Sequence, residues 1–174
     1  DGRSDLVVAL TGMNQIAVLL QSKTTPLAFS IATVTTVGGT SPRLVALADL
    51  NEDGRLDAIS GNTGSGNLTT MLGNGSGGLT VKGNFTLSSA GINILSSLCA
   101  GDFNRDCRTD VVTSSFNGSN MTVFLGLGDG DLAEPNNYEA EFTAKRAGAQ
   151  ITCVRPASDF QSVYVCDSAL PANQ

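Results

Sequence analysis

The chain has 174 residues, a net charge of −6 and no histidine or tryptophan. Without histidine, the sequence excludes His-based acid–base catalysis, Ser-His-Asp and Cys-His nucleophiles and most zinc enzymes. Its ten Lys and Arg form no basic cluster, which argues against nucleic acid as a partner. No apolar run approaches the roughly 18 residues of a membrane-spanning helix, so we expect no membrane span.

An internal repeat organises the chain. The segment 49–57, DLNEDGRLD, recurs as DFNRDCRTD at 102–110, an offset of 53 residues. The opening residues 1–5, DGRSD, match the second half of the same motif. We therefore expect units at residues 1–48, 49–101 and 102–150, followed by a degenerate partial unit at 151–174.

Short apolar runs surround each acidic segment and are bounded by Gly, Asn, Asp and Ser, which is typical of strands and hairpins. In chain order, the expected strands are 6–10, 16–20, 27–37, 45–48, 58–59, 68–72, 79–87, 95–100, 111–112, 121–125 and 162–166. No stretch as long as a typical helix has apolar residues at the 3.6-residue period of an α-helix. About four strands in each 53 residues predict an all-β protein made of β-propeller-type, four-stranded blades.

The number of blades is small for a closed propeller. The chain supplies about three blades and a degenerate fourth, whereas closed propellers have roughly four to eight. Exposed strand edges would favour association. We expect the chain either to be part of a larger propeller or to pack against other copies of itself.

The acidic segments have the spacing of a cation-binding loop. Side-chain oxygens at alternate positions of a tight turn can converge on a hard cation, and Gly54 permits the turn. An oxygen-only donor set favours Ca²⁺ over Zn²⁺ or copper, and Mg²⁺ is less favoured because it retains waters. The alternative is a polar turn without a metal, but the repetition of the motif and its density of like charges argue against it.

The loop, its strand context and the period resemble FG-GAP/VCBS repeats, the blades of integrin-α-like β-propellers. The resemblance covers residues 1–132 best, and it implies one Ca²⁺ in each loop. The implied ligands of the complete loops are Asp49, Asn51, Asp53, the Arg55 carbonyl and Asp57, then Asp102, Asn104, Asp106, the Arg108 carbonyl and Asp110. The first loop retains only Asp1, the Arg3 carbonyl and Asp5. Cys107 replaces the usual Gly of the motif.

Cysteines and sequons indicate the cellular compartment. Four cysteines allow three pairings, of which we expect two local disulfides, Cys99–Cys107 and Cys153–Cys166; the alternative is buried free thiols in a cytosolic protein. Asn67, Asn74, Asn84, Asn117 and Asn120 begin N-glycosylation sequons. If these sequons are used, the protein is extracellular, either secreted or on the cell surface; they could also be incidental.

These features predict a secreted, calcium-stabilised and N-glycosylated repeat module with a structural or adhesive role, such as a fibre or extracellular-matrix subunit. Its expected partners are copies of itself or further blades of a longer chain. A ligand-binding propeller, such as a lectin or receptor ectodomain with a protein or glycan ligand, is the alternative. We expect no enzymatic activity, because the Asp residues are explained as cation ligands.

Overall fold

The computed structural model describes residues 2–87, 95–115, 120–139, 152–154 and 164–166. For residues 120, 137–139 and the last two segments it describes the backbone alone. Its strands form antiparallel sheets, together with one short 3₁₀ turn at Thr11–Met13. The expected all-β class is therefore confirmed.

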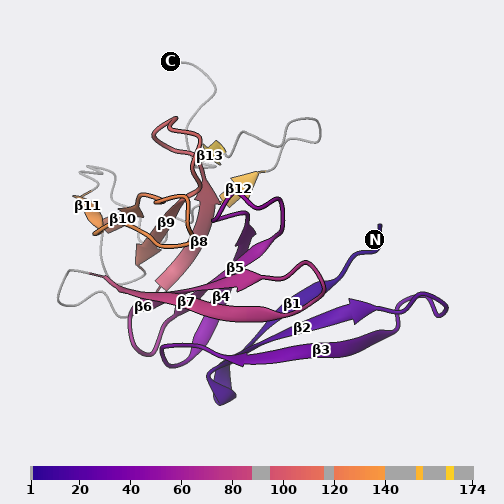
Figure 1. Ribbon diagram of the computed structural model, residues 1–174. Helices are drawn as coiled ribbons and strands as arrows, with labels where there is room; N and C mark the ends of the chain where they lie inside the picture. Colours follow the sequence, from indigo (N-terminus) through magenta and orange to yellow (C-terminus); the bar gives the residue numbers. More distant parts are fainter. Residues whose placement is uncertain (1, 88–94, 116–119, 140–151, 155–163, 167–174) are drawn as a thin grey trace.

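Three sheets follow one another along the chain. Sheet 1 contains β1 (Leu6–Leu10), β2 (Gln15–Gln21) and β3 (Phe29–Thr36). Sheet 2 contains β4 (Pro42–Ala48), β5 (Asp57–Asn62), β6 (Asn67–Gly73) and β7 (Leu79–Thr86). Sheet 3 contains β8 (Leu95–Gly101), β9 (Asp110–Ser115), β10 (Asn120–Phe124) and β11 (Asn136–Glu139). Figure 1 shows sheet 1 at one end of this series and sheet 3 at the other.

Each four-stranded sheet is a simple meander, with its strands in chain order. The first strand of sheets 2 and 3 precedes the acidic segment and pairs with the strand that follows it. Sheet 2 therefore begins at Pro42 and sheet 3 at Leu95, so the boundaries expected at 48/49 and 101/102 fall inside these sheets. Sheet 1 has no counterpart of β4 or β8 among the described residues.

The repeat is visible in fine detail. A register shift occurs in sheet 1 between Val18 and Leu19 and in sheet 2 between Thr70 and Met71, which is the same position one repeat later. Such shifts mark β-bulges, which bend and twist a strand. The shared bulge shows that sheets 1 and 2 are repeats of the same structural unit.

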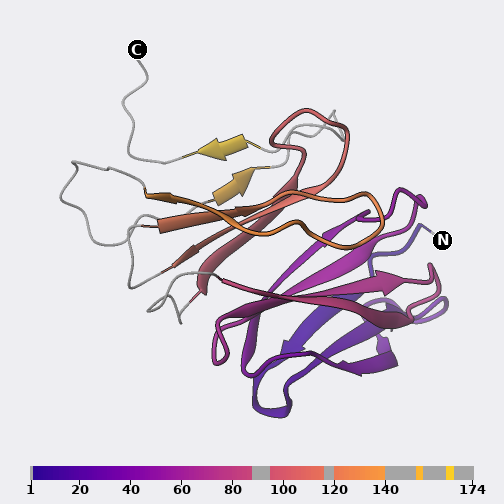
Figure 2. The ribbon, with the colours of Figure 1, turned by 60° about the vertical axis from the view of Figure 1, so that its left-hand side comes forward.

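Two apolar cores lie between the sheets. Ile16 and Val37 of the first unit pack with Ala58 and Met71 of sheet 2. A larger core joins sheets 2 and 3 and contains Leu50, Ile59, Leu68, Leu87, Leu95, Val111, Phe124 and Leu132. Sheet 2 thus buries both faces, and Figure 2 shows it lying between the other two sheets.

The last part of the chain contributes a two-stranded sheet of β12 (Thr152–Val154) and β13 (Tyr164–Cys166). β13 falls within the strand expected at 162–166. The rest of the expected degenerate unit lies outside the described residues. Closure of the sheets into a ring, and the number of blades, remain predictions.

Candidate functional site: the repeated acidic loops

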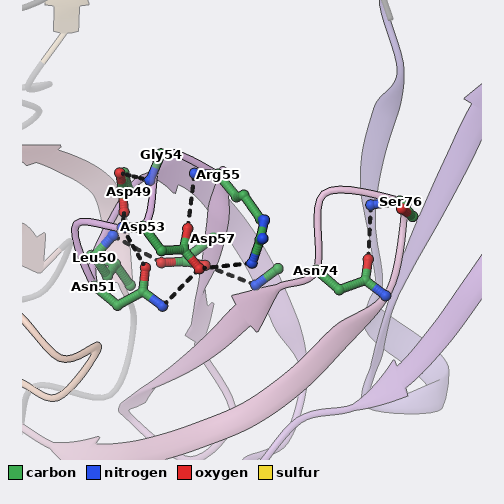
Figure 3. A network of polar contacts seen from close by, with 10 residues as sticks. Asp49, Leu50, Asn51, Asp53, Gly54, Arg55, Asp57, Asn74 and Ser76 are labelled. Carbon is green, nitrogen blue, oxygen red and sulfur yellow. Dashed lines mark hydrogen bonds and ion pairs between the residues drawn. The ribbon is translucent and has the colours of Figure 1, made fainter.

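The first complete acidic loop connects β4 to β5 and is closed by its own side chains (Figure 3). The Asp49 carboxylate accepts hydrogen bonds from the backbone N–H groups of Asp53, at 3.2 Å, and Gly54, at 2.8 Å. Asn51 Oδ1 accepts a second bond from the Asp53 N–H, and Asp53 Oδ1 accepts one from the Arg55 N–H. These Asx-type contacts hold the side-chain oxygens of positions 1, 3 and 5 on the inside of the turn.

Asp57, at position 9 of the loop, has a different environment. It is fully buried, and its two oxygens accept hydrogen bonds from the backbone N–H groups of Leu50 and Gly73. Burial raises the pKa of Asp57, and the two amide donors oppose this effect. Asp57 therefore ties the start of the acidic loop to the end of β6.

The second complete loop, between β8 and β9, repeats this geometry. The Asp102 carboxylate accepts hydrogen bonds from the N–H groups of Asp106 and Cys107, and Asn104 Oδ1 accepts a further bond from Asp106. The buried Asp110 accepts bonds from the N–H groups of Phe103 and Gly126. The two loops share these hydrogen bonds despite their different sequences, and the second loop adds one from the Arg105 N–H to Asp102 at 2.7 Å.

Cys107 occupies the position of Gly54. The two residues have φ angles of +70° and +79°, in the left-handed region that glycine adopts without strain. Their N–H groups make equivalent bonds, 2.9 Å to Asp102 and 2.8 Å to Asp49. The loop therefore keeps its turn and imposes a strained backbone on the cysteine.

The truncated first loop retains one element of the motif. The exposed carboxylate of Asp5 accepts a 2.9 Å hydrogen bond from the Gln21 N–H, 16 residues later, as Asp57 does from Gly73. Arg3 Nε donates to the Gln21 carbonyl at 3.1 Å. Asp1 lies outside the described residues.

The donors of the complete loops fit Ca²⁺ by chemical type, since they are carboxylate, amide and carbonyl oxygens. Each oxygen that accepts one hydrogen bond retains a second lone pair. In the described part of the chain, however, no three side chains among His, Cys, Asp and Glu form a group that could hold a metal ion. Asp57 and Asp110 accept hydrogen bonds from backbone amides, and their role as cation ligands stays a prediction.

Within each loop, neighbouring groups offset part of the negative charge. Arg55 Nη1 lies 3.3 Å from Asp53 Oδ2 in an exposed ion pair. In the second loop, Asn104 donates to Asp106 at 2.9 Å, and this bond, assisted by the Arg108 N–H, lowers the pKa of Asp106. Asp106 is therefore held in its charged form, the form that a cation would bind.

The acidic loop of sheet 2 also contacts the next unit. The Leu50 carbonyl accepts a 3.0 Å hydrogen bond from the N–H of Gly130, in the hairpin between β10 and β11. Nearby, Lys82 of β7 lies 3.0 Å from Asp131 and 3.5 Å from Asp129 of that hairpin. Sequence reasoning missed this inter-unit ion pair, because only the stacking of sheets 2 and 3 brings these residues together.

The expected Cys99–Cys107 disulfide is wrong. Cys107 is a free, exposed thiol, whereas Cys99 is buried and disulfide-bonded. The residue bonded to Cys99 lies outside the residues whose side chains are described, as do Cys153 and Cys166 of the second expected pair. Cys99 and Cys107 are close in sequence, but Cys99 lies in the packed sheet and Cys107 on the outside of the turn.

The sequons differ in their surroundings. Asn67 is buried, and its Nδ2, the atom that would bear a glycan, donates to the Gly38 carbonyl at 3.1 Å; this conformation leaves no place for a glycan. Asn74, in the exposed β6–β7 turn, uses only Oδ1 to accept bonds from Ser76 and Gly78 (Figure 3). Asn84 is exposed on β7. Asn117 and the side chain of Asn120 lie outside the described residues.

Stacked antiparallel meanders with one acidic loop per unit define a β-repeat protein. The chain belongs to the FG-GAP-like repeat family, whose model matches residues 1–60 and again 49–113. The two matches overlap at residues 49–60, which contain the acidic segment 49–57, and they confirm the resemblance found from the sequence. Comparisons with curated proteins and with solved structures found no match. In the described part of the chain, no helix has the length and apolar character needed to cross a membrane.

Proposed function

We propose that this chain is an extracellular structural or adhesive module in which Ca²⁺ at the acidic loops stabilises a stack of FG-GAP-like units. One observation carries the proposal: two loops with different sequences hold the same inward set of oxygens at the same place in successive sheets. FG-GAP repeats occur in extracellular or surface proteins, which supports this placement.

The charge of the loops supports a role for a cation. Asp49 and Asp53 share one turn of five residues, as do Asp102 and Asp106. Like charges at this separation repel each other, and an exposed pair with Arg55 offsets little of that repulsion. A hard divalent cation would neutralise both carboxylates at once. Side-chain oxygens of Asp49, Asn51 and Asp53, with the Arg55 carbonyl, would hold it, as would their counterparts in the second loop.

The position of the loop connects cation binding to assembly of the units. Because the Leu50 carbonyl accepts a bond from Gly130, the sheet 2 loop forms part of the junction with sheet 3. A bound ion would fix the loop and thereby the junction. This role needs rigidity and no reacting group, which agrees with a structural module.

Thermal unfolding tests the calcium proposal. At about 100 times its dissociation constant, a ligand that binds only the folded state adds roughly 2.7 kcal/mol of stability. For a chain of this size, that corresponds to a rise in melting temperature of about 5–10 °C. We expect such a rise when Ca²⁺ is added to chelator-treated protein. The rise should be smaller with the double variant Asp49→Asn, Asp53→Asn, because this variant leaves the second acidic loop intact.

The matched control is Glu134→Gln, which removes one exposed negative charge outside the loops. This variant should respond to Ca²⁺ as the wild type does. A melting temperature that is the same in chelator and in millimolar Ca²⁺ would contradict the calcium proposal.

Peptide mapping supplies an independent test of the expectation that this module is a glycoprotein. After expression through a eukaryotic secretory pathway, peptide mapping should find glycans at Asn74 and Asn84 and none at Asn67. Glycan-free peptides at Asn74 and Asn84 would contradict the expectation that this module is a glycoprotein.

A further inference from the structure

The face of sheet 3 that points away from sheet 2 is apolar and buried. The strand registers place Cys99, Val112 and Val123 side by side in one row across β8, β9 and β10. Their chain neighbours Val111 and Phe124 pack in the core between sheets 2 and 3, and successive side chains of a strand point to opposite faces. The row therefore faces away from sheet 2, yet its members are only 2 %, 3 % and 8 % exposed. We call these three residues the sheet 3 outer row.

The other two sheets show how such a row is buried. The equivalent row of sheet 2 is Ala46–Ile59–Thr70, and Ile59 is fully buried in the core that sheet 2 forms with sheet 3. In sheet 1 the equivalent pair is Val7 and Val18, and Val7 packs against the core that sheet 1 forms with sheet 2. In both units, the next unit along the chain covers the row.

Neither of the two apolar cores described above contains the sheet 3 outer row. By the order seen in sheets 1 and 2, its cover comes from the part of the chain that follows sheet 3. In that part the structure describes the paired strands β12 and β13, and both Figures 1 and 2 show them beside β8, the strand that holds Cys99.

The disulfide of Cys99 identifies the covering segment. The chain has four cysteines, and Cys107 is a free thiol. Because Cys99 is disulfide-bonded, its partner is either Cys153, in β12, or Cys166, in β13. In both cases a covalent bond joins sheet 3 to the two-stranded sheet.

We propose that β12–β13 is a fastened cover for sheet 3: it lies over the sheet 3 outer row and is held there by a disulfide between Cys99 and one of its own two cysteines. This bond replaces the Cys153–Cys166 pair expected from the sequence. It closes a long loop, and such cross-links stabilise a fold by restricting its unfolded chain. The cover keeps the apolar row from water, as the next sheet does in the other units. The proposal goes beyond the proposed function and does not depend on Ca²⁺.

The chemistry of the bond predicts how the cover is released. Two thiols form the disulfide by losing two protons and two electrons, and a disulfide-bearing oxidant takes up both and becomes a dithiol. Two cysteines of the chain then remain as thiols: Cys107 and the cysteine of β12–β13 that is not bonded to Cys99. A reducing agent should therefore break one intramolecular bond and loosen the cover.

Peptide mapping of the whole, non-reduced chain tests the pairing. Cleavage on the amino side of Asp places the four cysteines in four different peptides. Free thiols are blocked in acid, where little thiolate is present to exchange disulfides. We expect the Cys99 peptide to be linked to the peptide of Cys153 or of Cys166, and the Cys107 peptide to be unlinked. A bond between Cys153 and Cys166, or a free Cys99 thiol, would overturn the proposal.

Hydrogen exchange and thermal unfolding test the cover. When the wild type is reduced, the amides of β9 and β10 should exchange severalfold faster, whereas those of β2, in sheet 1, should not change. The melting temperature should fall by about 5 °C or more. Cys99→Ser should reproduce both effects without a reducing agent. If this variant does not fold, the reduced wild type still gives the result.

The matched control is Cys107→Ser, which removes the exposed free thiol. It should keep the link from Cys99 and respond to reduction as the wild type does. Unchanged exchange in β9 and β10 after reduction would overturn the fastening role of the disulfide. All of these measurements are made in chelator, so failure of the calcium proposal and failure of the cover are separate results.

Discussion

The Asp57 carboxylate lies 2.7 Å from the backbone nitrogen of Gly73, so that a buried acid at the start of β5 is bonded to the end of β6. The same contact, spanning 16 residues, joins Asp110 to Gly126 and Asp5 to Gln21. In all three units, the last Asp of the acidic motif thus links the start of one strand to the end of the next through a side-chain hydrogen bond. The sequence motif alone suggested a metal ligand.

Replacement of Asp57 by Asn should be strongly destabilising. An amide of the same shape can accept only with Oδ1, and its NH₂ group would face the N–H of Leu50 or Gly73. Leaving a buried donor unsatisfied costs roughly 1–3 kcal/mol, with bonds to charged groups at the upper end. Urea unfolding should show a loss of about 2–3 kcal/mol.

Asp5→Asn is the matched control for this change. Asp5 makes the equivalent bond to Gln21, but it is exposed, so water replaces the lost partner. We expect a loss of less than about 1 kcal/mol. Equal losses of stability from Asp57→Asn and Asp5→Asn would contradict the stabilising role of the buried Asp57 carboxylate.

Cys107→Gly should stabilise the protein. Cys107 has a φ of +70°, and a left-handed conformation costs an L-residue roughly 1–2 kcal/mol. Glycine removes this strain but gains entropy in the unfolded chain, so the net gain should be about 0.5–1 kcal/mol. Because Cys107 is free, the substitution breaks no disulfide. A lower urea midpoint for the variant would show that the thiol has a structural role.

Gly73→Ala should be among the most damaging changes in the chain. A Cβ at this position would collide with the Leu56 carbonyl oxygen, which is backbone and unable to move away. The equivalent Gly126 has the same relation to the Thr109 carbonyl. Overpacking of this kind costs about 1–3 kcal/mol or more. Thermal unfolding of Gly12→Ala, where a Cβ would meet nothing within 4 Å, supplies the control and should match the wild type.

Lys82→Met should remove an electrostatic contribution to the junction of sheets 2 and 3. The Lys82 pKa is raised, chiefly by its bond to Asp131. The pKa of Asp129 is lowered, first by the Asp131 N–H and then by Lys82. Asp129 therefore contributes to folding stability at pH values above its ordinary pKa of 3.8, and this contribution is lost as the pH falls through its lowered pKa. Lys82 contributes to folding stability at pH values below its ordinary pKa of 10.5, and this contribution is lost as the pH rises through its raised pKa.

The difference in urea midpoint between wild type and Lys82→Met should accordingly be largest near neutral pH. It should shrink in acid and at about 1 M salt, where the Debye length is roughly 3 Å. Lys23→Met, at an exposed residue of the β2–β3 turn, controls for the loss of one positive charge. A difference that persists unchanged in high salt would assign the effect of Lys82 to packing rather than to charge.

The strands and loops were predictable because their signals are local. β1 spans Leu6–Leu10 as expected, and β2 and β7 lie within a residue of the predicted runs. The Asx contacts of Asp49 and Asp102 reach no further than five residues along the chain. A turn of this length is specified by its own side chains, whatever packs around it.

Tertiary structure decided the rest. In the sequence, Asp57 looks like any other acidic residue of the motif; in the structure it is buried and bonded to Gly73. In the same way, Asn67 begins a sequon like the others, but its side chain is bonded to Gly38 of the preceding unit. Cys99 and Cys107 are near neighbours in sequence, but one lies in a packed strand and the other on an exposed turn.

The sequence by itself therefore determined the repeat, the all-β class, the family and the acidic turns, because each depends on residues close together in the chain. Only the stacking of the sheets decided which of those residues are buried and which polar atoms have partners. These properties depend on the free energy of contacts between units some 50 residues apart, and the order of residues within one unit does not contain that information.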